Sequence, residues 1–287
     1  MNKRLGNVRW AAMRMLMNTV GRLSEGIRIG YRYGFDSGSM LDYVYVNKAS
    51  GSWGVGRLID RSYLNAIGWR AIRARRELLK DVLRKEIAAR GDEVFVLDVA
   101  SGPGRYLQDL VEEYAPGRLR VECRDLDRAG LAQGEEQARQ RGLQGISYVH
   151  GDALEPRPGD RKPEVIVVSG LYELLLDDET IAASITRLRS LLAPGGVLVY
   201  TTQTHHPQLE FIARVLPNRD GVLWEMKCRS VERAEQWARD AGFDAVGSRR
   251  EQVGLFTVTT AGTVTTAGRA GAAARQDQQG ARSGSHD

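Results

Sequence analysis

A short glycine-rich segment is the part of this 287-residue chain whose residue types most clearly indicate chemistry. Asp98 lies within an apolar stretch and is followed by Ala100, Gly102 and Gly104. Glycines at such a turn let the backbone approach a ligand closely and lead directly into a helix. A nicotinamide-binding fingerprint would have a third glycine where Leu107 stands. The early acid at Asp98 instead suits a cofactor that carries an amine and a carboxylate.

Further carboxylates follow at positions where they could hold a nucleoside. Asp125 comes just after the next expected strand, 21 residues past Gly104, and a carboxylate there can accept both ribose hydroxyls. Asp127 is the other candidate for that contact, although a helix N-cap is its simpler interpretation. Asp152 and Ala153 follow a third strand, where a carboxylate can bind the exocyclic amine of adenine; a turn aspartate is the alternative.

An alternation of strands and helices from residue 94 onward must position these groups. The expected strands are 94–100, 119–123, 146–149, 165–168, 197–201, 245–249 and 255–259, with helices at 106–114, 129–141, 179–192, 208–216 and 231–241. This spacing predicts an α/β fold with a mostly parallel sheet and helices on both faces. The stretch 203–229 is long for a connector, which is typical of a lid or a functional insertion.

The first 90 residues differ from the rest in charge and in pattern. They carry 18 Lys and Arg against 7 Asp and Glu, whereas the remainder carries 23 against 29. We expect a helical segment with an amphipathic stretch at Ala11–Leu23, a glycine-rich loop at 49–56 and one long helix at Ile59–Ala88. The basic residues of that long helix, Arg75 among them, are expected to face solvent. Such a basic segment could meet anionic lipid, nucleic acid or an anionic substrate, or be only a solvated face.

The aromatic residues of this segment could line an acceptor pocket or pack the helices, and packing is the simpler expectation. They are Tyr43, Tyr45, Trp53, Tyr63 and Trp69. We expect residues 33–70 to cover the cofactor cleft.

Composition sets the remaining limits. We divide the chain into a helical N-terminal segment or lid (1–90), a cofactor-binding domain (91–262) and a tail (263–287) with too little apolar bulk to order. Cys123 and Cys228 are too few for a disulfide framework or a structural zinc site, and Cys123 is expected in the core. No segment is apolar enough to span a bilayer and no cleavage site follows the basic N-terminus, so a cytoplasmic location is expected.

Taken in order, these features resemble the class I S-adenosylmethionine (SAM)-dependent methyltransferases over about residues 94–260. Two more segments carry the resemblance, Ser169-Gly-Leu-Tyr after the fourth strand and Pro194-Gly-Gly before the fifth. The resemblance implies a Rossmann-like, seven-stranded sheet with SAM over the carboxyl ends of the first strands. It implies a cofactor site in which Asp98 and the glycines surround the methionyl part, Asp125 holds the ribose, and Asp152 with Ala153 holds the adenine. The full expected set is Asp98, Ala100, Gly102, Gly104, Asp125, Asp152, Ala153 and Ser169, with Ala100 standing where the family usually has its first glycine.

A narrower resemblance, to a family of bacterial methyltransferases, extends over nearly all of the chain except the tail. It is carried by residues 33–45, 58–70, 168–174 and 206–210. Some members of that family have an additional α/β-hydrolase domain on the same chain, but this sequence contains no G-x-S-x-G nucleophile elbow. The resemblance implies a reaction class and no particular substrate.

Methyl transfer mainly requires in-line alignment of the acceptor, because a sulfonium is a good leaving group. A general base helps when the acceptor is an alcohol or a phenol. His205, His206, Tyr172 and Glu173 are the candidates, and we select His206, which lies in the His-Pro-Gln stretch of the narrower family, together with Tyr172. A surface role for the histidine and a role for Tyr172 in capping the cofactor pocket are the alternatives. The paired histidines have no third ligand, so no metal site is expected.

The acceptor class is left open as a small molecule or a lipid, with peripheral membrane contact through the basic N-terminus. One alternative is an RNA methyltransferase, but the sequence has neither an Asn-Pro-Pro-Tyr motif nor a known RNA-binding module, so nucleic acid is not an expected partner. Others are a non-catalytic SAM-fold partner protein and a nicotinamide oxidoreductase, which Leu107 and Asp98 disfavour.

Overall fold

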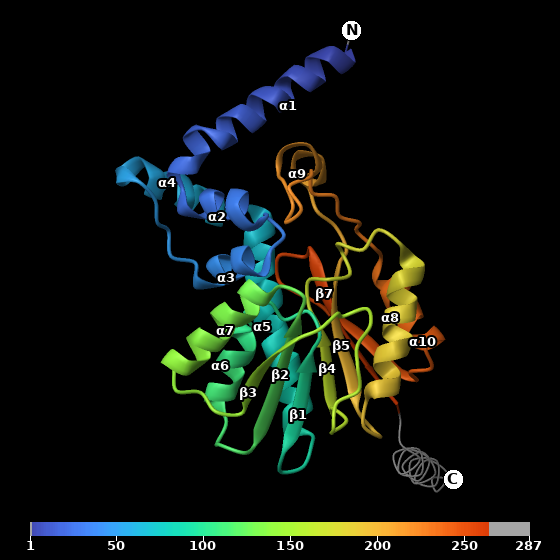
Figure 1. The fold of residues 1–287 in the computed structure, drawn as a ribbon. Coiled ribbons are helices and arrows are strands. Elements are labelled where there is room, and N and C mark those ends of the chain that lie inside the picture. The colour runs from blue at the N-terminus through green and yellow to red at the C-terminus, as the bar shows by residue number, and fades with distance from the viewer. Residues whose placement is uncertain (1, 264–287) are drawn as a thin grey trace, which may run out of the picture.

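The centre of the molecule is a seven-stranded sheet in the order β3-β2-β1-β4-β5-β7-β6 (Figure 1). The computed structural model describes the backbone of residues 2–263 and the side chains from residue 8 onward, so nearly all of the expected tail lies outside the described residues. β1 to β5 run parallel, whereas β7 is antiparallel to both β5 and β6. The strands are β1 Val94–Asp98, β2 Leu119–Asp125, β3 Ile146–His150, β4 Val165–Val168, β5 Val197–Gln203, β6 Ala245–Arg250 and β7 Phe256–Gly262. The expected mostly parallel sheet is confirmed.

Helices cover both faces of this sheet, which explains why its central strands are apolar along their whole length. On one face, Val96 and Val165 pack in a cluster with α5 (Ile67–Ala88) and α6 (Arg105–Glu113). On the other face, Leu97 and Ile166 pack with α8 (Asp178–Leu191) and α10 (Val231–Asp240). Successive strand residues point to opposite faces, so each strand contributes to both clusters. α7 (Arg128–Gln140) contacts β2 and β3.

Local capping explains where two helices of this domain, α7 and α10, begin. Asp127 accepts a hydrogen bond from the Ala129 N–H and starts α7, as its N-cap interpretation predicts. Ser230 does the same for α10 by accepting from the Arg233 N–H. The insertion 203–229 contains one short helix, α9 (Leu209–Val215), which contacts α1.

The N-terminal segment folds as a layer of short helices above the carboxyl ends of the strands (Figure 1). These helices are α1 Asn2–Asn18, η1 Val20–Leu23, α2 Glu25–Tyr33, α3 Gly38–Val46 and α4 Trp53–Leu64. The single helix expected over Ile59–Ala88 is wrong, because Ala66 is extended (φ −55, ψ 145) and separates α4 from α5. α4 also begins at Trp53, so the glycine-rich loop is shorter than expected.

The expectation that Arg75 faces solvent is also wrong. Its side chain is 1 % exposed, because this side of α5 packs against β7, with the guanidinium 4.8 Å from the ring centroid of Phe256. The expectation for Cys123 is confirmed, since it is fully buried.

Among residues 2–263, no helix combines the length and the apolar composition that a membrane-spanning segment needs. In the same residues, no three histidine, cysteine or acidic side chains come together as ligands for a metal ion.

Candidate functional site

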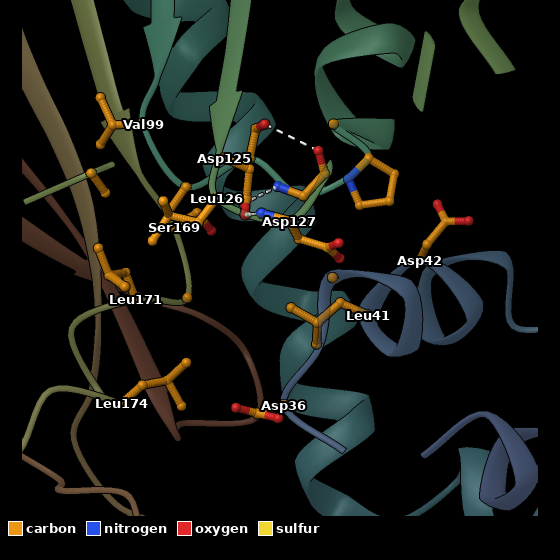
Figure 2. A pocket seen from close by; sticks show the side chains of 18 of the residues that line it. Asp36, Leu41, Asp42, Val99, Asp125, Leu126, Asp127, Ser169, Leu171 and Leu174 are labelled. Carbon is orange, nitrogen blue, oxygen red and sulfur yellow. Dashed lines mark hydrogen bonds between the residues drawn. The ribbon is translucent and has the colours of Figure 1, made fainter. Parts of the chain in front are cut away.

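A cavity of about 250 Å³ lies at the carboxyl ends of β1, β2 and β4, between the sheet and the N-terminal layer (Figure 2). We call it the first cavity. All of the predicted cofactor-binding residues except Asp98 line this cavity. The predicted residues that line it are Ala100, Gly102, Gly104, Asp125, Asp152, Ala153 and Ser169. Loops that follow parallel strands meet at one edge of the sheet, which is why residues so far apart in sequence gather here.

Asp125 connects two of these loops. Its Oδ2 accepts a hydrogen bond from the Gly102 N–H at 2.7 Å, and its Oδ1 accepts one from the Asp127 N–H at 2.9 Å. Each carboxylate oxygen can accept a second hydrogen bond. Asp125 therefore holds the glycine turn in place and still has the capacity to bind two hydroxyl groups.

Asp98 lies beneath the first cavity rather than in its lining. It is fully buried and accepts hydrogen bonds from the Tyr106 hydroxyl and from the Ala100 N–H. Burial raises its pKa to about 7, although these hydrogen bonds act in the opposite direction. In the structure, Asp98 stabilises the turn at Ala100 by accepting the hydrogen bond from its N–H.

Two glycines of the turn have positive φ angles and little room for a side chain. Gly102 has a φ of 53°, and a Cβ atom there would be 3.1 Å from the Cα of Gly38 in α3. Gly104 has a φ of 68°, and its Cβ would be 2.7 Å from the Cys123 Sγ. The turn thus needs glycine for its conformation and for the close approach of α3.

The N-terminal layer closes the first cavity from above. Asp36, Leu41 and Tyr45 line it, as expected of a segment that covers the cleft. Figure 2 shows Leu41 on the opposite side of the cavity from Leu171, which follows β4. Sequence reasoning did not single out Arg219, which lines the cavity from the insertion and donates its backbone N–H to Asp36 at 2.7 Å.

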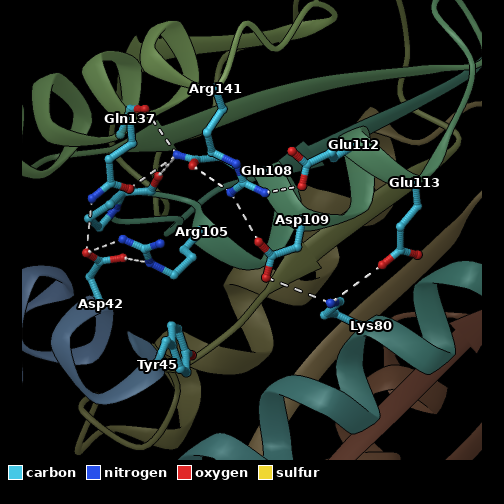
Figure 3. A network of polar contacts seen from close by, with 12 residues as sticks. Asp42, Tyr45, Lys80, Arg105, Gln108, Asp109, Glu112, Glu113, Gln137 and Arg141 are labelled. Carbon is cyan, nitrogen blue, oxygen red and sulfur yellow. Dashed lines mark hydrogen bonds and ion pairs between the residues drawn. The ribbon is translucent and has the colours of Figure 1, made fainter. Parts of the chain in front are cut away.

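A polar network attaches this layer to the sheet domain (Figure 3). Asp42 in α3 is buried and accepts hydrogen bonds from Arg105 in α6 and from Gln133 and Gln137 in α7. Arg105 forms an ion pair with Asp42. Because Asp42 joins three helices, it fixes the position of α3 over the glycine turn.

The charge of the first cavity is negative. Asp125, Asp127 and Asp152 line it, and none of the three forms an ion pair with a described residue. The two arginines in the lining, Arg105 and Arg219, are already paired with Asp42 and Asp36. A ligand with a net positive charge would complement such a lining.

A second cavity of about 220 Å³ adjoins the first one. The two share part of their lining, including Gly170 after β4 and Leu174. The second cavity lies between α1, α5 and the insertion that contains α9, and its walls are mainly apolar. Side chains that form these walls include Met17, Trp69, Ile72, Phe211, Trp224 and Phe256.

A buried ion pair lies at the wall of the second cavity. Arg75 Nη1 is 2.9 Å from Glu173 Oε1, and both side chains are almost completely buried. Burial disfavours the charged form of Arg75, but Tyr45 and Glu173 outweigh it, and the pKa of Arg75 lies above its usual value. Arg75 Nε and Nη2 and Glu173 Oε2 have no hydrogen-bond partner among the described residues. Buried polar atoms of this kind usually have a partner, so the wall has capacity to bind one.

His206 lines the second cavity and is 7 % exposed. Its Nδ1 accepts a hydrogen bond from the Gln208 N–H at 3.1 Å, so the proton of the neutral ring is on Nε2. Burial, together with the neighbouring His205, lowers the pKa of His206 to about 4. At neutral pH the ring is therefore uncharged and offers an N–H donor.

The structure does not bring Tyr172 to either cavity. Its ring is buried against α8 and Tyr200, and its hydroxyl is 3.2 Å from Ser184 Oγ. Its sequence neighbour Glu173, in contrast, lines the second cavity.

The N-terminal aromatic residues have different roles. Tyr45 lines the first cavity, while Tyr63 and Trp69 line the second and also pack together edge to face. Tyr43 donates a hydrogen bond to the buried Asp60. Trp53 neither packs nor lines a cavity, since it is 86 % exposed.

Comparison with known proteins identifies one family. The model of a family described as "Putative methyltransferase" matches residues 1–263. The chain is also 42 % identical over 257 residues to the uncharacterized protein YnbC of Escherichia coli K12. The aligned residues make up 87 % of this chain and 44 % of YnbC. The chain thus spans less than half of the length of this relative.

Solved structures show the same fold at low sequence identity. A protein of Bordetella parapertussis described as a "possible exported protein" has a TM-score of 0.69 and 20 % identity, over 91 % of this chain and 95 % of that one. Magnesium protoporphyrin IX methyltransferase from Synechocystis, solved with bound S-adenosylhomocysteine (SAH), has a TM-score of 0.57 and 15 % identity, over 83 % and 99 % of the two chains.

Proposed function

The chain belongs to this methyltransferase family, and we propose that it transfers a methyl group from SAM, bound in the first cavity, to an apolar acceptor bound in the second. The observation that carries the proposal is the pair of adjoining cavities, one polar and negative and the other apolar. They share Gly170 and Leu174, so ligands in the two cavities would be in contact.

The first cavity has a donor and acceptor set that fits SAM. Asp125 has free acceptor capacity for two ribose hydroxyls, and Asp152 Oδ1 accepts only the Leu154 N–H, which leaves Oδ2 for the adenine amine. The three unpaired carboxylates would complement the positive charge of SAM. When bound, SAM supplies a methyl group on a sulfonium leaving group.

The second cavity supports an apolar acceptor, either a small molecule or a lipid-type molecule. Its mainly apolar walls would pack against the acceptor and align it with the neighbouring cavity, which is the main requirement of methyl transfer. We assign the role of proton acceptor to Glu173, because it lines this cavity and its Oε2 is unpartnered. His206 would donate a hydrogen bond to the acceptor through Nε2, and Tyr172 would support the loop that carries Glu173.

The proposal is tested by incubating the protein with methyl-labelled SAM and bacterial extract separated into organic and aqueous fractions. We expect label in a product of the organic fraction, with equimolar SAH formed. Label only in nucleic acid, or SAH binding without transfer to any fraction, would contradict it.

A further inference from the structure

The first turns of α4 expose apolar side chains that no other part of the described chain covers. Trp53 is 86 % exposed, Leu58 66 % and Val55 58 %. We call these three residues the apolar tip. Single exposed apolar residues are common on soluble proteins, but several together on one projecting element mark a contact surface.

α4, which carries the apolar tip, lies at the outer edge of the N-terminal layer, away from the sheet (Figure 1). α4 packs on η1, with the Gly56 backbone against Leu23. Val20 of η1 and Leu16 at the end of α1 are each about half exposed. Exposed apolar side chains therefore lie on α4, on η1 against which it packs, and on α1, which contacts η1.

The exposed charge of the N-terminal layer that carries the apolar tip is almost entirely positive. Between residues 8 and 64, all eight basic residues are exposed: Arg9, Arg14, Arg22, Arg28, Arg32, Lys48, Arg57 and Arg61. Of the four acidic residues in this stretch, the side chains of Asp36, Asp42 and Asp60 are buried and hydrogen-bonded. The fourth, Glu25, is paired with Arg28.

Two of these cations belong to α4 itself. Arg57 and Arg61 are one turn apart, on either side of Leu58 in sequence, and neither forms an ion pair with a described residue. Their long side chains can reach phosphate groups while the apolar tip enters a less polar layer. An amphipathic helix with this composition lies at the interface of a bilayer that contains anionic lipids.

We propose that this face docks on an anionic lipid bilayer, with Trp53, Val55 and Leu58 inserted at the boundary of headgroups and acyl chains and Arg57 and Arg61 at the phosphates. A nucleic acid would use the arginines but would leave Val55 and Leu58 without a role. The proposal narrows the expected membrane contact from the basic N-terminus to α4 within it. It rests on this surface alone and does not depend on methyl transfer.

The test is co-sedimentation of the full chain with vesicles of phosphatidylcholine alone and of phosphatidylcholine mixed with phosphatidylglycerol. We expect binding to the mixed vesicles only, which weakens as salt increases. The double variants Trp53→Ser/Leu58→Ser and Arg57→Glu/Arg61→Glu should each lose about tenfold or more in vesicle affinity. Because these side chains are exposed, far-UV circular dichroism should be unchanged. Matched controls are Val222→Ser, an exposed valine in the insertion, and Arg139→Glu, an exposed arginine of α7.

Fluorescence gives a second readout that reports insertion directly. Lipids with a nitroxide on the acyl chain should quench tryptophan emission in the wild type and much less in Trp53→Leu, which keeps an apolar side chain and should still sediment. Absence of binding to the mixed vesicles would overturn the proposal. Equal binding of the wild type and of Trp53→Ser/Leu58→Ser to the mixed vesicles would also overturn it. If transfer RNA competed with the vesicles equally well for these two proteins, the surface would be assigned to nucleic acid instead.

Discussion

The Asp125 carboxylate accepts a hydrogen bond from the Gly102 N–H across 2.7 Å, which joins the end of β2 to the turn that follows β1. Its second oxygen accepts from the Asp127 N–H. One side chain thus shapes the floor of the first cavity and presents acceptors to it, so the two functions should fail together when it is changed.

Asp125→Asn should weaken SAH binding by about ten- to hundredfold, because an amide has one acceptor oxygen for two backbone donors and its NH₂ group opposes one of them. Titration calorimetry measures this. The matched variant is Asp127→Ala, which removes the cap of α7 and should lower the free energy of unfolding by about 1 kcal/mol with a smaller effect on SAH affinity. A larger loss of SAH affinity in Asp127→Ala than in Asp125→Asn would assign the ribose contact to Asp127.

Gly38→Ala tests whether α3 must approach the glycine turn closely. A Cβ there would be 3.0 Å from the Gly102 Cα, so α3 or the turn has to shift by a few tenths of an ångström. We expect weaker SAH binding with little change in stability, measured by calorimetry and urea unfolding. Gly54→Ala is the control, because nothing lies within 4 Å of its added methyl group. Equal SAH affinity in both variants would mean that α3 does not belong to the cofactor site.

Asp98 should make the unliganded protein less stable as pH rises. Its pKa is about 7 in the folded state, against about 3.9 in an unfolded chain. Between these values the folded state holds a proton that the unfolded state has lost, so the free energy of unfolding falls across this window. The contribution is complete below about pH 4 and is lost above about pH 7. Urea unfolding at several pH values should show the wild type losing stability relative to Asp98→Asn as pH rises across this window, a comparison from which the contributions of other titrating groups drop out. A difference between the two proteins that does not change with pH would place the titration elsewhere.

His206 should have the opposite effect in an overlapping window. Its pKa of about 4 in the folded state is below the value of about 6.5 for a free histidine, so the unfolded state binds a proton that the folded state does not. The contribution of His206 to the free energy of unfolding therefore falls as pH decreases from about 6.5 to about 4, and in the wild type it opposes the contribution of Asp98. His206→Gln should remove this acid sensitivity, whereas His205→Gln, at an exposed position, should largely retain it. Acid sensitivity that survives in His206→Gln would contradict the buried, neutral state.

Variants of the Arg75–Glu173 pair should distinguish its contribution to stability from its contribution to methyl transfer. Arg75→Met alone leaves a buried carboxylate without its partner and should cost about 3–5 kcal/mol of stability, whereas Arg75→Met/Glu173→Leu should recover most of it. The double variant and Glu173→Gln should bind SAH normally, because neither residue lines the first cavity. Both should transfer label from SAM to the organic fraction at a greatly reduced rate. Unchanged transfer by Glu173→Gln would exclude Glu173 as the proton acceptor.

The sheet and much of the lining of the first cavity were predictable because they depend on local patterns. Apolar strands buried on both faces and glycines at a tight turn leave a signature along the chain, as at β4 and at Gly102. The break between α4 and α5 was not predictable, since neither of the residues between them, Asn65 and Ala66, is a proline or a glycine. The burial of Arg75 depends on Glu173, 98 residues away, and the lining role of Arg219 depends on the path of an irregular insertion. Such partners are set by tertiary packing, which spacing alone does not encode.

The most direct test of the central claim is calorimetric titration of the wild-type chain with SAM and with SAH. We expect saturable binding of both at one site per chain, and competition between them for that site. A folded protein that binds neither would contradict the claim that the first cavity is a SAM site.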